Sequence, residues 1–420
     1  MHVKRLIAEF LQFLKEYKIL VSIHVVLFLF SIVYVCFDYV FDFSGIKVLN
    51  DFAEYYYTAR VFFQEGPTKI YDIAYMLAMQ VDSFRSLLAV LGYFYLFTVF
   101  QLVPSYVIYS LLALCINLCT MFMTLKTIKV IEGLAGGQAG LVERSRRFVM
   151  AFFVVIYFFE IYMQGQVIVY VALCSVLGLY FFLTRNEIAG SLCLGISIVF
   201  KPISIFVVFF LLLDRDLKRV VRRLLFVIIP LLPDMLIFTL NPVLLENFIA
   251  FNTFGFRSLY SFYPAISFST LLIEFADLSS LQAMIIALAI ALILGLIVLR
   301  KMKNAQQKLI FAFLYGIGLY FFVQADVWTS QLLVLYPFLV LSFPFVEHAY
   351  KKNALFSFFI CYPLVCEIGI FDYSIFFPGG AALNMVLRII ISGSTIVLIA
   401  MIARYFLAEK NVLGLLQASN

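Results

Sequence analysis

Charged residues are scarce in this 420-residue chain. They make up 13% of it, whereas 65% of the residues are hydrophobic and 18% are aromatic. A water-soluble domain is nearer half apolar and a quarter charged, so this composition excludes a soluble fold. Apolar runs without an ionisable side chain, such as residues 278–299, are long enough to cross about 30 Å of hydrocarbon. The chain is therefore predicted to be a polytopic membrane protein.

Short segments of alternating polar and apolar residues, as in an outer-membrane barrel, are also missing. Because lipid cannot satisfy free backbone N–H and C=O groups, membrane-spanning segments without that alternation must be helical. We expect an all-α, multi-pass membrane protein with a single integral-membrane domain over residues 1–420.

Histidine is rare, and neither cysteine nor basic residues gather into a motif. None of the three histidines lies in a predicted outer loop, so no histidine metal site is expected. The seven cysteines all lie inside apolar runs and form no disulfide framework. The net charge of +6 comes from short Lys and Arg clusters between apolar runs, which indicates membrane topology and excludes nucleic acid as a partner.

Topology follows from these basic clusters, because Lys and Arg beside short loops stay in the cytoplasm. Five clusters are placed inside, at 4–18, 126–147, 215–223, 300–308 and 351–352. The segments left outside are 42–85, 163–166, 241–279, 324–330 and 371–384. Both termini are then cytoplasmic, about 12 segments lie in a membrane that we take as the plasma membrane, and residues 19–41 form the first span. Residues 1–18 have the helical apolar spacing of a cytoplasmic interfacial helix.

Two apolar stretches do not fit a simple count of crossings. Residues 86–103 are predicted to be a juxtamembrane helix that ends the first extracytoplasmic loop, 42–104, with the second span at 105–125. Residues 188–213 need both ends on the cytoplasmic side. Lys201-Pro202 divides them, which predicts two short helices that enter the membrane and return, with Lys201 at the turn.

Three polar features are candidates for chemistry, and each has a plainer alternative. Asp51 begins an amphipathic segment and is either a helix N-cap or a catalytic carboxylate. Lys201 within a membrane segment needs either a buried carboxylate or a ligand phosphate, because an isolated charge there is costly. Gln164-Gly165-Gln166 offers two amides to a ligand or is a polar turn. Glu54 is read most simply as an acidic residue of the first helical turn.

Taken in order, these features resemble glycosyltransferase family 87, polyprenyl-phosphate-mannose-dependent transferases of the GT-C superfamily. The first stretch runs from Asp51-Phe52 through Tyr55-Tyr56 to Gly66 and Ile70-Tyr71-Asp72. The second is the most specific: Gln164-Gly165-Gln166-Val167, a span, then Ala189-Gly190, Gly195 and Phe200-Lys201-Pro202. The third is Trp328 before Gln331. In the family the Trp is commonly followed by histidine, whereas here Thr329, Ser330 and Gln331 follow it.

The resemblance implies a GT-C-type bundle with amphipathic juxtamembrane helices in its first extracytoplasmic loop, and an extracytoplasmic active site. Asp51 would be the general base of an inverting sugar transfer to a hydroxyl of a lipid-linked or glycan acceptor. Lys201, with Arg257 and Arg85, would bind the phosphate of the polyprenyl-phosphate donor. No cofactor and no metal is implied. The remaining expected substrate contacts are Glu54, Tyr55, Gln164, Gln166, Trp328 and Gln331.

Two other functions fit part of the pattern. A secondary transporter or a flippase of a lipid-linked or anionic substrate also has about 12 segments, a broken helix and an intramembrane Lys. Transporters usually repeat such a discontinuity in both halves, whereas the sequence breaks only residues 188–213. A non-catalytic lipid-binding scaffold is the third possibility.

Overall fold

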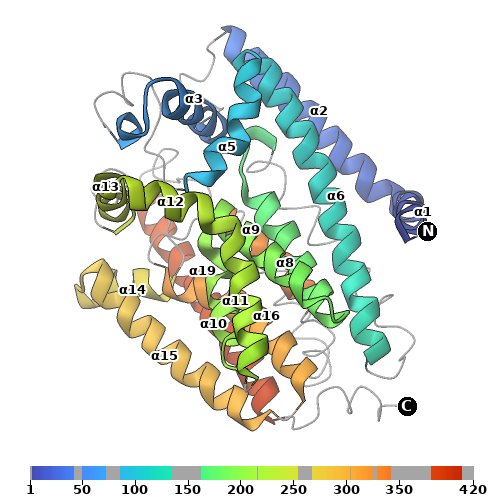
Figure 1. The fold of residues 1–420 in the computed structure, drawn as a ribbon, viewed down its shortest axis with the longest axis vertical. Helices are drawn as coiled ribbons and strands as arrows, with labels where there is room; N and C mark the ends of the chain where they lie inside the picture. The colour runs from blue at the N-terminus through green and yellow to red at the C-terminus, as the bar shows by residue number, and fades with distance from the viewer. Residues whose placement is uncertain are drawn as a thin grey trace.

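The structure is a computed structural model in which every regular element is helical. It describes residues 2–41, 50–71, 86–134, 162–214, 216–253, 267–302, 304–324, 329–341 and 380–408. Within these ranges there are α-helices and short 3-10 helices and no strand (Figure 1). The predicted all-α fold is confirmed for this part of the chain.

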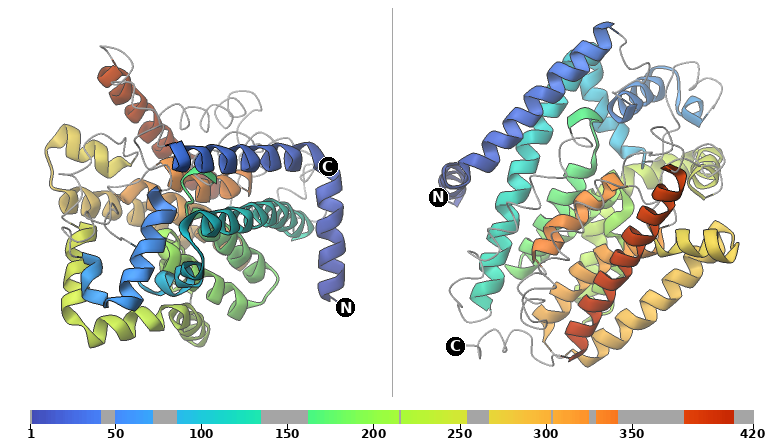
Figure 2. Two further views of the ribbon diagram at one scale, coloured as in Figure 1. Left: turned by 90° about the horizontal axis from the view of Figure 1, so that it is seen from above. Right: turned by 180° about the vertical axis from the view of Figure 1, so that it is seen from behind.

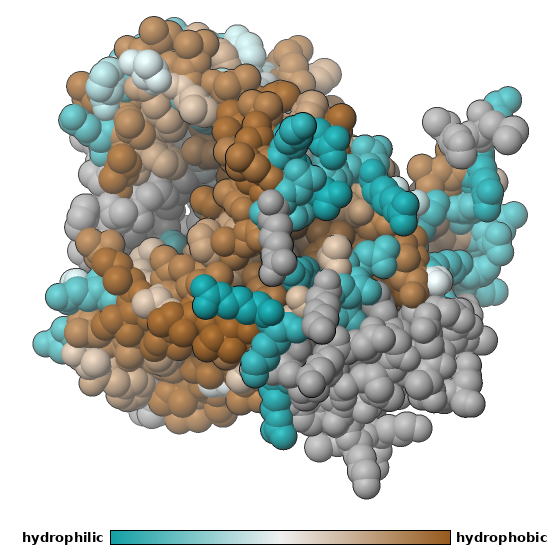
Figure 3. Space-filling model, turned by 60° about the horizontal axis from the view of Figure 1, so that its bottom comes forward, coloured by the Kyte–Doolittle hydropathy of each residue, from teal (hydrophilic) through white to brown (hydrophobic). Residues whose placement is uncertain are grey.

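Among the described residues, five helical runs are long and apolar enough to cross a membrane. They are Lys18–Phe37, Leu102–Leu134, Leu217–Leu240, Ser280–Lys301 and Ala305–Val323. Large apolar side chains on several of them face outward: Ile285 and Ile293 are 56% and 60% exposed, and Figure 3 shows hydrophobic side chains over broad areas of the surface. Soluble proteins rarely expose contiguous apolar surface on this scale. The prediction of a multi-pass membrane protein is supported, and the count of about 12 segments stays a prediction.

The N-terminal helix is a separate element from the first long helix. One residue, Tyr17, separates helix α1 (His2–Glu16) from α2 (Lys18–Phe41), and α1 runs across the end of α2 (Figure 2). Phe13 packs on Phe122 of α6 (Leu102–Leu134), and Glu9 forms a 2.7 Å ion pair with Lys126 of the same helix. Residues 1–18 therefore contain the expected helix, and its place at a membrane surface stays a prediction.

The first predicted outer loop contains several short helices. They are α3 (Asn50–Gln64), η1 (Pro67–Tyr71), α5 (Ala89–Tyr95) and η2 (Leu96–Val99). An amphipathic helix in this loop could lay its apolar face on the bilayer, but most of the apolar face of α3 packs against protein. Phe52, Tyr55, Tyr56 and Ala59 are buried, and the Phe52 ring packs against rings of α5, η2 and α6. An apolar helix face can be covered by protein as well as by lipid. The spacing of apolar residues in the sequence is the same in both cases and does not show which one covers the face.

Helix α6 (Leu102–Leu134) begins three residues earlier than the predicted second span and extends well past it. Pro104 does not block the start, because proline in the first turn lacks only an N–H that has no helical partner there. The expected separation from the preceding short helices is observed, since residues 100 and 101 are not helical.

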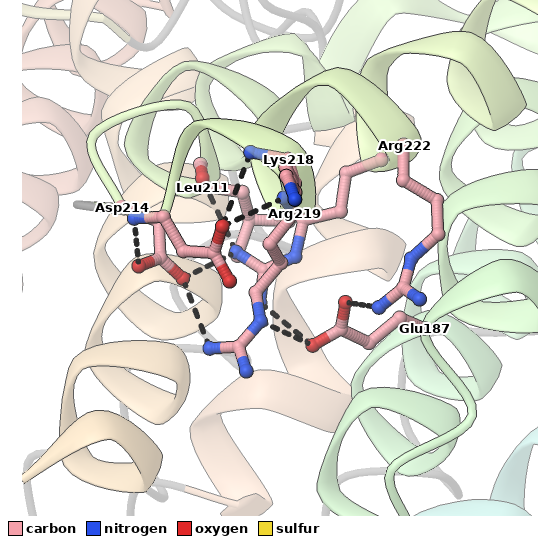
Figure 4. A network of polar contacts seen from close by, with 8 residues as sticks. Glu187, Leu211, Asp214, Lys218, Arg219 and Arg222 are labelled. Carbon is pink, nitrogen blue, oxygen red and sulfur yellow. Dashed lines mark hydrogen bonds and ion pairs between the residues drawn. The ribbon is translucent and has the colours of Figure 1, made fainter.

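A broken helical hairpin occupies residues 187–211, as expected. Helix α8 (Ile168–Leu183) packs along α9 (Glu187–Phe200), and η4 (Pro202–Ser204) and α10 (Ile205–Leu211) follow the break. Lys201 has extended backbone angles, φ −154° and ψ 140°. The two ends of the hairpin meet, because the Arg219 guanidinium contacts both Glu187 at 3.2 Å and Asp214 at 3.5 Å (Figure 4).

Helix α16 lies in the interior of the second half. Its residues from Ile310 to Val323 are all buried, and it contacts α8, α10, α15 and α19. The helices of this half are α11 (Leu217–Ile228), α12 (Leu232–Leu240), α13 (Pro242–Thr253), α14 (Phe268–Ala276), α15 (Ser280–Lys301), α16 (Ala305–Val323) and α19 (Gly380–Ala408), with η5 (Ile229–Leu231) and η6 (Thr329–Val334).

Candidate active site

The Gln164-Gly165-Gln166 segment is a tight turn directly before α8. Gly165 has φ +70°, a left-handed conformation that glycine adopts without the steric cost of a side chain. A Cβ at this position would lie 2.6 Å from the Cβ of Phe52. The Phe52 N–H donates to the Gln164 carbonyl at 3.1 Å. The first turn of α3, which contains Asp51, is therefore held directly against this turn.

Gln166 connects the same turn to two further elements. Its side chain is almost fully buried, at 4% exposure. The Tyr109 hydroxyl of α6 donates to the Gln166 carbonyl at 2.9 Å, and Lys201 Nζ donates to Gln166 Oε1 at 3.5 Å. The break of the α9–α10 hairpin is thus attached to the turn that also holds α3.

The turn brings the predicted base and the predicted phosphate ligand into one neighbourhood. Phe52, beside Asp51, is bound at Gln164, and Lys201 is bound at Gln166. Two residue steps of backbone reach at most about 7 Å. The Phe52 ring also packs against the Tyr109 ring at a centroid distance of 5.1 Å, and the Tyr109 hydroxyl is the group bound to the Gln166 carbonyl.

Aromatic side chains of α5 cover this region. Tyr55 stacks on Phe94 at a centroid distance of 4.6 Å and its hydroxyl lies 3.1 Å from Ser86 Oγ. Tyr93 and Tyr170 place their hydroxyls 2.5 Å apart. Tyr170 in turn stacks at 4.8 Å on Phe200, the residue before Lys201.

Sequence reasoning missed Tyr93, Tyr109 and Tyr170. Each is a tyrosine in a largely apolar segment, and a buried phenol needs a hydrogen-bond partner. That rule marks these residues as polar contacts, but their partners come from other helices and are not visible in the sequence.

Asp234 is a second acidic residue that the sequence reading passed over. It lies on α12, is 3% exposed, and accepts a hydrogen bond from the Ala89 N–H at the start of α5 at 2.9 Å. Its Oδ2 has no hydrogen-bond partner among the described residues. An acid inside the apolar run Leu217–Leu240 was the available signal, because such residues are costly and usually have a role.

The other predicted site residues divide into two groups. Glu54 is partly buried in α3. Gln331 is 9% exposed in η6, which contacts α8, and its Oε1 has no hydrogen-bond partner in the described part of the chain. Arg85, Arg257 and Trp328 lie outside the described residues.

Metal-binding side chains do not cluster in the described ranges. No group of three or more His, Cys, Asp and Glu residues there is placed to hold an ion. The chemistry that the turn assembles is that of a carboxylate, which accepts a proton, and an ammonium group, which neutralises an anion.

Comparisons with known proteins give a weak structural likeness and no family. No family model matches the chain, and no curated protein matches it. Two solved structures of ArnT from Cupriavidus metallidurans are similar. The one bound to undecaprenyl phosphate has 12% identity and a TM-score of 0.39, covering 96% of this chain and 77% of that one. The apo one has 14% identity and a TM-score of 0.36, covering 93% and 76%. Similarity at this level does not establish a shared fold, and the resemblance to family 87 stays a prediction.

Proposed function

We propose that the protein is a membrane glycosyltransferase that moves a sugar from a polyprenyl-phosphate donor to a hydroxyl of a lipid-linked or glycan acceptor. The observation that supports this function best is the Gln164–Gly165–Gln166 turn. It holds the helix that bears Asp51 and also binds Lys201, so that a proton acceptor and a phosphate-binding cation lie in one neighbourhood of a membrane protein.

Asp51 is the general base of this mechanism. A sugar hydroxyl is a poor nucleophile near neutral pH, so a carboxylate within hydrogen-bond reach must take its proton as the hydroxyl oxygen attacks the anomeric carbon. The new C–O bond forms as the bond from the anomeric carbon to the donor phosphate breaks. One displacement of this kind inverts the anomeric configuration.

Lys201 stabilises the leaving group. The electron pair of the broken bond stays on the polyprenyl phosphate. An ammonium group stabilises this negative charge more strongly in a low-dielectric site than it does in water. Arg85 and Arg257 are proposed as further phosphate ligands. Glu54, Tyr55, Gln164, Gln166, Trp328 and Gln331 are proposed contacts to the sugar and the acceptor, and mannose is proposed on the family resemblance.

A secondary transporter or flippase is the second candidate. The hairpin broken at Lys201 favours it, because transporters bind anionic substrates at interrupted helices near the middle of the membrane. Such a protein would move its substrate without breaking the bond between sugar and phosphate.

One experiment with the protein in sealed vesicles distinguishes the two functions. Polyprenyl-phosphate mannose labelled in the sugar is supplied with a membrane lipid extract as acceptor, and labelled product and labelled donor on the far side are both measured. We expect product formation that falls at least about 100-fold in Asp51→Asn, which keeps the size and capping ability of Asp51 but not its basicity. Glu54→Gln, which removes the other carboxylate of the same helix, is measured beside it as the test of the alternative base. Donor movement without product would support the transporter, and near-normal turnover of Asp51→Asn would reject Asp51 as the base.

A further inference from the structure

Helix α11 exposes an apolar stripe with basic residues directly beside it. Leu217, Val221 and Leu225 recur every four residues and are 72%, 47% and 57% exposed. Lys218 and Arg222 each follow a member of the stripe by one position and are also exposed. The outward face of α11 is therefore apolar along one line and cationic along the next.

The side of α11 next to this cationic line is fixed by ion pairs, and Arg222 takes part in them. Glu187 accepts from Arg219, Arg222 and Arg223 at 3.2, 2.8 and 3.1 Å, and Asp214 accepts from Arg219 and Arg223 at 3.5 and 3.1 Å (Figure 4). Arg223 is buried beneath the helix. These contacts hold α11 in one orientation, so its exposed cations are presented in a fixed geometry.

Positive charge is left over after this pairing. Three arginines face two carboxylates, and Lys218 adds a cation while Asp216, which accepts from the Lys218 and Arg219 N–H groups, adds a carboxylate. Four described cations against three carboxylates leave one net positive charge. Lys218 takes part in none of the ion pairs seen among the described residues around α11. Arg222 uses one terminal nitrogen on Glu187 and retains other N–H donors, with 52% of its side chain exposed.

The position of α11 places these cations at a membrane boundary. Helix α11 opens the apolar run Leu217–Leu240, which is long enough to cross a membrane. The exposed apolar side chains continue beyond the first turns at Ile229, Leu232 and Leu236. With that surface in hydrocarbon, the first turns of α11 lie at headgroup depth, where Lys and Arg extend their charged ends toward water and phosphate.

We propose that Lys218 and Arg222 bind the phosphate of an anionic phospholipid, whose acyl chains lie along the Leu217, Val221 and Leu225 stripe. The two cations are four residues apart on one face, about 6 Å between their Cβ atoms, a spacing that one phosphate group bridges. The apolar stripe selects a lipid over a free phosphate ion, because it adds contact area that the ion cannot use. This site lies on α11, does not involve the Gln164–Gln166 turn, and does not depend on the proposed transferase activity.

Lipid binding to the purified full-length protein tests this proposal. Native mass spectrometry in detergent measures retention of dioleoyl-phosphatidylglycerol, of zwitterionic dioleoyl-phosphatidylethanolamine, and of the first lipid in the presence of inorganic phosphate. We expect the anionic lipid to be preferred, with binding that weakens as salt rises. Lys218→Gln with Arg222→Gln should weaken it about 30-fold, from the usual contribution of two cations at a membrane surface.

The matched control removes the same charge elsewhere. Arg300 and Lys301 are an exposed basic pair at the end of α15, but they are adjacent in sequence and do not share a face. Arg300→Gln with Lys301→Gln should leave the preference nearly intact. If the α11 double variant loses stability, the single Lys218→Gln variant, which breaks no ion pair seen in the described chain, should still weaken binding about fivefold.

Three results would overturn the proposal. The first is unchanged lipid binding in the α11 variants, and the second is an equal loss of lipid binding in the α15 control. The third is displacement of the bound anionic lipid by inorganic phosphate as effectively as by added lipid. The first removes the site, the second shows diffuse attraction to net charge, and the third shows a phosphate site that does not recognise lipid.

Discussion

Gly165→Ala is the substitution for which the structure gives the clearest magnitude. The left-handed backbone at φ +70° costs an alanine roughly 1–2 kcal/mol. The new methyl group would lie 2.6 Å from the Phe52 Cβ, and overpacking of this kind costs about 1–3 kcal/mol more. Phe52 is fully buried among aromatic rings and has little room to move. After a small gain from restricting the unfolded chain, we expect a net loss of about 2–4 kcal/mol.

The same clash should reduce turnover. Relief of the contact must separate the turn from the first turn of α3, which displaces Asp51 relative to Lys201, and a shift near 1 Å in a reacting group can cost about 100-fold in rate. Labelled-sugar transfer and the thermal unfolding midpoint are measured on one detergent preparation. Gly66→Ala is the control, because Gly66 also has positive φ, +114°, but a Cβ there has open space. It should lose some stability and keep its turnover.

Normal turnover and an unchanged unfolding midpoint in Gly165→Ala would refute the reasoning, since they would mean that the turn and α3 do not touch. Equal losses of turnover in both glycine variants would refute the link between this turn and the site, because a Cβ at Gly66 would meet nothing within 4 Å.

Three further outcomes are expected. Lys201→Met should weaken donor binding about 10- to 100-fold, the scale of a lost charge-assisted contact; a loss of stability near 3–5 kcal/mol with unchanged donor binding would instead identify Lys201 as the partner of a buried carboxylate. Burial raises the pKa of Asp214, but the hydrogen bond from the Asp216 N–H and the charge of Arg223 outweigh it and hold that pKa below its usual value. Asp214 therefore stabilises the fold above the unfolded-state pKa of about 3.9, and this contribution should disappear as pH falls through the lower folded-state value; the unfolding midpoint should fall on acidification below about pH 5, and this dependence should flatten in Asp214→Asn. A single cysteine within 60–70 should react with an impermeant thiol reagent on intact cells and one within 135–140 should not; the reverse pattern would invert the predicted topology.

Local sequence rules predicted the elements of this protein well. The scarcity of charge required a membrane protein, because isolated charges and free backbone groups are costly in hydrocarbon. Proline at 202 required the break after Lys201, since it has no N–H to donate and crowds the preceding turn. The amphipathic helix after Asp51 and the apolar helix within 278–299 followed from spacing and length alone. Each of these results depends on residues that are neighbours in the chain.

Contacts between distant segments were decided only by the tertiary structure. Spacing shows that one face of α3 is apolar, but not whether lipid or the rings of α5 and α6 cover it. The cost of a buried carboxylate marks Asp234 as unusual, but not that it binds the start of α5. Asp51 and Lys201 were candidates from their positions in the sequence. Their common attachment to the Gln164–Gln166 turn depends on Phe52, Tyr109 and the left-handed Gly165, because hydrogen bonds and close packing between helices are set by the fold as a whole.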